Sequence, residues 1–218
     1  MQFSRPFYIV IALLFIFSAA FGLFFTWAGL LFAFVGAIFT ILLLLVLFIQ
    51  LVSKNSMTSP LSLLAILWGA QVIGLTANIL KPEPAPMLDN PDNPSHQIRY
   101  MYNTSLVDQQ QIKYFLFESY ADNMRERDSI RIYQVMGYLD QNEINEPKQK
   151  YHAATILRRG YKSDHFKTGH ELAKEAESED PDLPNITRLK ETLHDLWQMK
   201  EGRDPDYDTH RLPVPGNI

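Results

Sequence analysis

Histidines and carboxylates that could bind a metal ion or transfer protons gather in the last third of the chain. The histidines of this stretch are His152, His165, His170 and His194. A metal site on one helix needs two ligands on the same face, whereas His165 and His170 are five positions apart, a rotation of about 140°. The sequence 169–172 (GHEL) begins like the zinc motif HExxH, but the second histidine is missing. We therefore expect neither a metal site nor a cofactor.

Asp195, His194 and Tyr207 form the combination best suited to catalysis, around a turn predicted at Gly202. A carboxylate, an imidazole and a phenol could serve a hydrolase if they converge in a concave pocket. The chain has no Gly-rich phosphate loop, no GxSxG or SxxK motif and no cysteine. A membrane-tethered, hydrolase-like enzyme is therefore an alternative interpretation, not the first.

Clustered arginines could bind an anion. They are Arg125, Arg127, Arg131, Arg158 and Arg159. Acidic neighbours at Asp122, Glu126 and Asp128 favour intramolecular ion pairs instead, so we expect a structural role.

Aromatic residues are in surplus from Tyr100 to Tyr120, and they cannot all face one core. Interfaces are enriched in exposed aromatic residues, so part of this segment is expected to meet a partner or the membrane surface. Amide side chains within an apolar segment can serve the same purpose by bonding to another helix. The predicted partner interface comprises Tyr114, Phe117, Tyr120, Gln71 and Asn78.

Charge divides the chain into two unlike parts. The first 81 residues carry three basic residues and no acidic one, whereas 82–218 carry 17 basic and 24 acidic residues, a net charge of −7. An acidic part of this size can bury its own core, and it lacks the basic face that nucleic acid requires. We expect no nucleic-acid partner.

An apolar stretch from Pro6 to Leu80 is interrupted by a single charge, Lys54. Because about 20 apolar residues cross a bilayer, this stretch predicts three transmembrane helices, at roughly 7–25, 30–52 and 61–80. Ser18-Ala19-Ala20 resembles a signal-peptide cleavage site, but a second apolar segment follows immediately, so we expect a retained anchor. Small residues at four-residue spacing favour packing of the helices on one another over packing on other subunits.

Arg5 and Lys54 flank the first two predicted spans on one side, so the positive-inside rule places the N-terminus in the cytoplasm. Three crossings then place the acidic part in the periplasm or outside the cell. These observations predict a multi-pass protein of the cell inner membrane.

The rest of the chain predicts a helical bundle on a spacer. Residues 81–95 hold five prolines, which favour an extended linker, assigned to 82–104. Caps and stops predict a domain of about five helices over 105–202, followed by an extended tail, 203–218, held by Tyr207 or Leu212. The expected helices are 105–123, 128–139, 147–159, 163–178 and 185–201.

Two stretches, 151–175 and 195–209, resemble a bacterial helical domain family of unknown function. Residues that fit its pattern include Ala153, Ala154, Gly160, Asp195, Met199, Gly202, Tyr207 and Thr209. The chain departs from the pattern at Arg158-Arg159, Leu196, Asp206 and His210, where the family has a Gln-His pair, an arginine and two glutamines. The resemblance implies a helical fold and no particular reaction.

We therefore expect an all-α membrane protein with a three-helix anchor over 1–81. Its expected role is that of an accessory or structural subunit that contacts the lipid bilayer and other membrane protein subunits. A periplasmic binding or sensor module is a further alternative, and it would require an enclosed cavity in the bundle.

Overall fold

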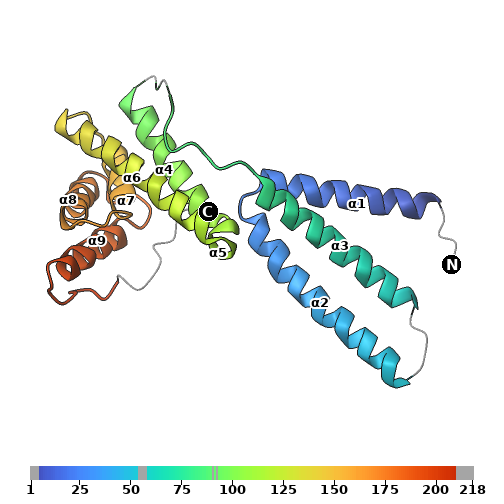
Figure 1. Ribbon diagram of the computed structural model, residues 1–218. Coiled ribbons are helices and arrows are strands. Elements are labelled where there is room, and N and C mark those ends of the chain that lie inside the picture. The colour runs from blue at the N-terminus through green and yellow to red at the C-terminus, as the bar shows by residue number, and fades with distance from the viewer. Residues whose placement is uncertain (1–4, 54–57, 90, 92, 210–218) are drawn as a thin grey trace. The chain divides into compact units, whose positions relative to one another are not determined.

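A computed structural model describes residues 5–53, 58–89, 91 and 93–209 of the chain. Within these ranges every regular element is a helix (Figure 1). The chain forms two compact units. The apolar unit comprises Met1–Glu83 and Gln110–Glu118, and the polar unit comprises Pro84–Gln109 and Ser119–Ile218.

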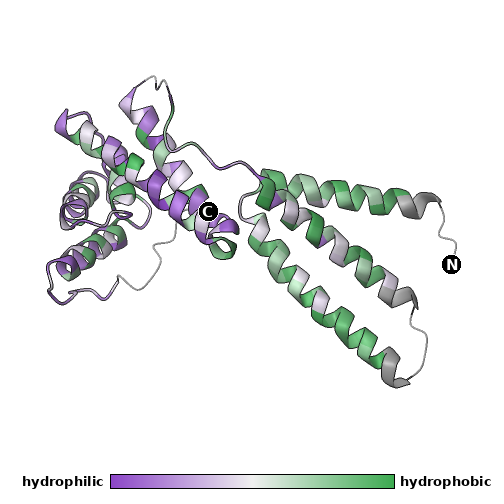
Figure 2. Ribbon diagram, in the orientation of Figure 1, coloured by the Kyte–Doolittle hydropathy of each residue, from purple (hydrophilic) through white to green (hydrophobic). Residues whose placement is uncertain are grey.

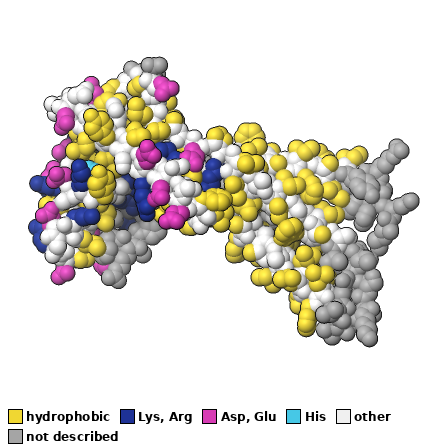
Figure 3. Space-filling model, viewed as in Figure 1, with side chains coloured by type: hydrophobic (Ala, Val, Ile, Leu, Met, Phe, Trp, Pro, Cys, Tyr) yellow, Lys and Arg dark blue, Asp and Glu magenta, His cyan; other side chains and the backbone are white. Residues whose placement is uncertain are grey.

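The apolar unit contains α1 (Arg5–Phe24), α2 (Ala28–Ser53), α3 (Thr58–Leu80) and the single-turn helix α5 (Lys113–Leu116). Helix α3 lies between α1 and α2 (Figure 1). Figure 2 colours these three helices hydrophobic along most of their length, and Figure 3 shows mainly hydrophobic side chains over them.

Two of these helices are long and apolar enough to cross a membrane, over Ala28–Ile49 and Ser62–Leu80. The sequence predicted three such spans. Among the residues whose side chains are described, α1 contributes a shorter apolar helix, Ile9–Phe24. Lys54 lies outside the described residues.

Glycines allow the three long helices to approach closely. A Cβ atom on Gly22 of α1 would lie 2.2 Å from the carbonyl oxygen of Gly74 on α3, and a Cβ on Gly74 would lie 2.5 Å from the Phe32 ring of α2. The predicted packing of small residues inside the anchor therefore describes the contacts between these helices.

The polar unit contains α4 (Pro94–Gln110), α6 (Glu118–Asp140), α7 (Pro147–Leu157), α8 (Ser163–Glu179) and α9 (Ile186–Lys200). All five contribute to one hydrophobic core. Helix α7 is the central one: every residue from Gln149 to Leu157 is buried. Its Ala153 and Ala154 are fully excluded from solvent, which lets neighbouring helices pack against its backbone.

The predicted helix 105–123 is wrong. Helix α4 begins at Pro94, inside the expected linker 82–104, because proline suits the first helical turn and Asn93 accepts a hydrogen bond from the His96 N–H at 2.8 Å. The chain then breaks at Gln111 and Ile112 before α5, and α6 extends from Glu118 through the predicted helix 128–139. The remaining three helices lie within about three residues of the predicted bounds.

Candidate functional site

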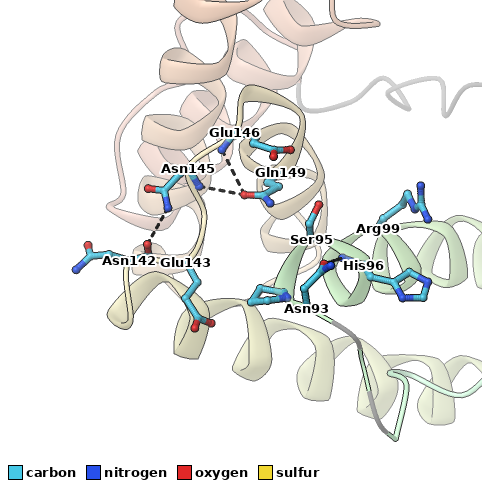
Figure 4. Close-up of a pocket in the computed structure, with 10 residues that line it drawn as sticks. Asn93, Ser95, His96, Arg99, Asn142, Glu143, Asn145, Glu146 and Gln149 are labelled. Atoms are coloured by element: carbon cyan, nitrogen blue, oxygen red, sulfur yellow. Dashed lines mark hydrogen bonds between the residues drawn. The ribbon is translucent and has the colours of Figure 1, made fainter.

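An open groove runs along the polar unit between α4 and α7. Three adjoining cavities of about 850, 190 and 440 Å³ make up its length, and Arg99 lines all three. Figure 4 shows the widest part, between the start of α4 and the loop that precedes α7. We call this feature the α4–α7 groove.

The wide end of the α4–α7 groove is polar and is shaped by hydrogen bonds of the loop before α7. The backbone N–H groups of Asn145 and Glu146 donate to Gln149 Oε1 at 3.0 and 3.3 Å (Figure 4). This capping interaction fixes the start of α7 and therefore one wall of the groove.

The middle of the groove carries two basic side chains, Arg99 and Lys148, and one acidic side chain, Glu146, beside His152. Neither Arg99 nor Lys148 forms an ion pair with another described residue. Burial lowers the pKa of His152 to about 4, and the positive charges of Lys148 and Arg99 act in the same direction. The imidazole is therefore neutral near pH 7, which leaves Arg99 and Lys148 to attract an anionic group.

The narrow end of the groove has an aromatic and apolar lining. The Tyr102 ring stacks on His152 with a centroid distance of 4.2 Å, and Tyr151 lies 5.8 Å from Tyr102. Burial, together with the contact to Tyr151, raises the pKa of Tyr102, so its phenol stays protonated. Leu106, Leu183 and Pro184 also line this end, together with the acidic side chain of Asp180. Such a lining favours an apolar or aromatic group next to an acidic one.

The hydrolase-like alternative rests on Asp195, His194 and Tyr207, and the structure brings the three together at the end of α9. The His194 and Tyr207 rings lie 5.6 Å apart, and Asp195 accepts a hydrogen bond from the Tyr207 backbone N–H at 2.9 Å. The second Asp195 oxygen accepts the N–H and the hydroxyl of Thr209 at 2.7 and 2.9 Å. Both oxygens of this fully buried carboxylate are thus engaged in holding the chain after α9.

The electrostatics of Asp195 agree with a structural role. Burial acts to raise its pKa, but the donors from Tyr207 and Thr209 outweigh burial and hold the pKa below its usual value. Of the two residues predicted to hold the tail, Tyr207 supplies a contact through its backbone, and Leu212 lies outside the described residues.

Three of the clustered arginines, Arg125, Arg127 and Arg131, form ion pairs within the polar unit, as the structural interpretation expects. Arg127 and Arg131 bind Asp108 of α4, Arg131 also binds Asp128 at 2.8 Å, and Arg125 pairs with Asp122 on the surface. Arg158 is half-buried; burial, with the neighbouring charge of Arg159, lowers its pKa to about 10.

The residues of the predicted partner interface separate into two groups. Tyr114 and Phe117 are exposed, in the segment that contains α5. Tyr120 is only 3% exposed, and its hydroxyl donates a hydrogen bond to Asp108. Asn78 is also buried. Its side-chain amide donates hydrogen bonds to carbonyl oxygens at the end of α1, those of Gly22, Phe25 and Thr26. Gln71 packs toward Gly36 of α2. Tyr120 and Asn78 are therefore committed to internal contacts.

The α4–α7 groove was not predicted from the sequence. Its residues come from three segments around 93–106, 142–152 and 180–184, and the first of these was assigned to a linker. The available signal was the sequence PDNP at 91–94, which also suits the start of a helix.

Comparison with known proteins adds no relative: no family model, no curated protein and no solved structure matches the chain. The resemblance to a bacterial helical domain family therefore stays a prediction.

Proposed function

We propose that the protein is an accessory subunit of a larger membrane protein assembly, and that its polar unit binds an acidic segment of another subunit in the α4–α7 groove. The observation that carries this proposal is the pair Arg99 and Lys148, which form no ion pair with the described residues. They lie in the middle of an open groove that has an aromatic end and that also carries the carboxylates of Glu143, Glu146 and Asp180.

The shape and chemistry of the groove favour an extended protein segment as the ligand. The three cavities follow one another along α4 and α7, so a ligand that fills them must be elongated. Basic side chains in the middle select a carboxylate, and Tyr102, Tyr151 and Leu106 select a neighbouring apolar side chain.

In this proposal α1 is a third transmembrane helix, and α1, α2 and α3 together form the membrane anchor. The N-terminus lies in the cytoplasm and the polar unit lies in the periplasm or outside the cell, as the positions of Arg5 and Lys54 in the sequence favour.

The test is site-specific photocrosslinking in native membranes, with a photoreactive amino acid at Leu106 in the groove or at Tyr133, an 81% exposed residue of α6, as the control. We expect one discrete protein adduct from position 106 and none from position 133. The proposal fails if position 106 yields no adduct, or the same diffuse products as position 133.

Charge reversal then tests the role of the two cations. The double variant Arg99→Glu/Lys148→Glu should reduce the adduct by about tenfold or more, since losing one favourable charge contact costs about 1.4 kcal/mol or more in such interfaces. The matched control, Lys174→Glu/Lys200→Glu, changes the net charge equally at exposed positions outside the groove and should leave the adduct unchanged. Equal loss in both double variants would contradict recognition by the groove.

A further inference from the structure

A run of four large apolar side chains, Tyr114–Phe117, is exposed where α5 joins α6. Their exposed fractions are between 42% and 64%. Consecutive exposed aromatic and aliphatic side chains are unusual on a surface that faces water, and they mark a contact with protein or lipid.

This segment belongs to the apolar unit and is fixed to one end of its long helices. The Lys113 ammonium donates a hydrogen bond to the carbonyl oxygen of Lys81, the residue that follows α3. The Ile112 side chain packs on Gly29 at the start of α2, where an added Cβ would lie 2.7 Å from Ile112 Cγ2. Helix α5 therefore lies at the end where α1 turns into α2 and where α3 terminates (Figure 1).

The neighbouring ends of the long helices expose apolar side chains as well. Phe24 and Leu80 are 79% and 74% exposed, and Phe25 and Trp27 of the α1–α2 turn are more than 40% exposed. The apolar surface of the long helices thus continues onto the segment that contains α5. Tyrosine and tryptophan at such an end are typical of the boundary between lipid head groups and acyl chains.

The backbone of this segment is suited to a low-dielectric environment. The Tyr114, Phe115 and Phe117 N–H groups donate to the carbonyl oxygens of Gln111, Ile112 and Lys113 at 2.9–3.1 Å. A helical turn with internal hydrogen bonds can enter the head-group region without exposing unpaired backbone donors to lipid.

We propose that Tyr114–Phe117 forms a second membrane contact, inserted at the boundary between head groups and acyl chains of the bilayer that holds the long helices. This inference rests on the proposed membrane anchoring. Its ligand is lipid, argued from the continuity of the apolar surface and from the placement of α5 at one end of the helices. The contact would hold the segment between α4 and α6, which contains α5, at the membrane surface.

The experiment uses single cysteines for an environment-sensitive fluorophore, because the chain has no cysteine. The variants are Phe115→Cys, Phe34→Cys at an exposed position of α2, and Tyr133→Cys on α6. Each full-length protein is labelled and reconstituted in phosphatidylcholine vesicles that contain no other protein, with quenching bromines either near the head group or near the end of the acyl chain.

We expect the label at position 115 to show a blue-shifted emission and to be quenched more by shallow than by deep bromines. The label at position 34 should be quenched more by deep bromines, and the label at position 133 only by aqueous iodide. Leu116→Cys serves as a second reporter, expected to behave like position 115.

The outcomes separate the two proposals. If the labels at 115 and 116 respond only to iodide while the label at 34 is quenched in lipid, the second membrane contact is wrong and the anchoring stands. If the label at 34 also responds only to iodide, both are wrong.

Discussion

Arg131 of α6 donates a hydrogen bond to Asp108 of α4 at 2.8 Å, and both side chains are completely excluded from solvent. Asp108 also accepts from Arg127 through both carboxylate oxygens and from the Tyr120 hydroxyl. Asp128 forms an ion pair with Arg131, so two carboxylates balance the charges of the two arginines. This buried network joins two helices of the polar unit, and a buried charge is tolerated only when such partners are present.

Asp108→Asn should therefore destabilise the polar unit strongly, by about 3–5 kcal/mol, because two buried arginines lose their shared carboxylate. Thermal unfolding of the detergent-solubilised protein, followed by circular dichroism, measures the loss. The matched control is Asp122→Asn, which removes an exposed pair with Arg125 and should cost less than about 1 kcal/mol. Similar losses in the two variants would show that the buried network contributes little.

Gly22→Ala should disrupt the packing of α1 on α3. Its Cβ would lie 2.2 Å from the Gly74 carbonyl oxygen, a backbone atom that no side-chain rotation can move away. The control is Gly36→Ala, whose Cβ would meet Gln71 Cβ at an ordinary 3.6 Å. We expect a lower melting temperature in detergent for the first variant alone, and equal melting temperatures would contradict the close approach of α1 and α3.

His152 should make the polar unit less stable in mild acid. Its pKa is about 4 in the folded chain, below the ordinary 6.5, so the unfolded chain binds the proton more tightly. The contribution of His152 to the free energy of unfolding is therefore fully present above about pH 6.5. It decreases by up to about 3 kcal/mol as the pH falls toward 4. His165 and His170, whose pKa values burial also lowers, act in the same direction.

The measurement is the melting temperature between these two pH values for the natural protein and for His152→Gln, which carries no titrating group. The variant should lose less stability on acidification than the natural protein. Parallel pH profiles would show that His152 is not buried as a neutral imidazole.

Asp195→Asn should release the chain that follows α9. The variant cannot accept from the Tyr207 and Thr209 N–H groups with both side-chain atoms, and charge-assisted bonds of this kind contribute about 1.5–3 kcal/mol. Tryptic cleavage after Arg203, an exposed residue, should become faster. In the control, Asp206→Asn, only the contact to His194 weakens, and cleavage should stay near the natural rate.

Short-range signals in the sequence were enough to place most helices. The long runs without charge define α2 and α3, and Pro147, Ser163 and Asn185 mark the starts of α7, α8 and α9 within a residue or two. Prolines were misleading at 91–94, because the same residue type favours both an extended spacer and the first turn of a helix.

Long-range pairing was beyond sequence reasoning. The arginines were expected to pair with neighbours such as Asp128 and Asp122, and they do, but Asp108 lies 19 and 23 residues before its two arginine partners. No local periodicity predicts that contact. The α4–α7 groove could not be predicted for the same reason, since Arg99, Lys148 and Asp180 approach one another only after the helices have packed.

The apolar unit is assembled from two separate stretches of chain, residues 1–83 and 110–118. During synthesis α3 leaves the ribosome before Ile112 and Lys113 do, so this end of the long helices stays uncovered until about 33 further residues (113 − 80) emerge. A fragment that begins at Pro84 would expose the apolar side chains of Tyr114–Phe117 to water and would therefore tend to aggregate. Recombinant production of the polar unit alone therefore calls for replacing 110–118 with a short hydrophilic link.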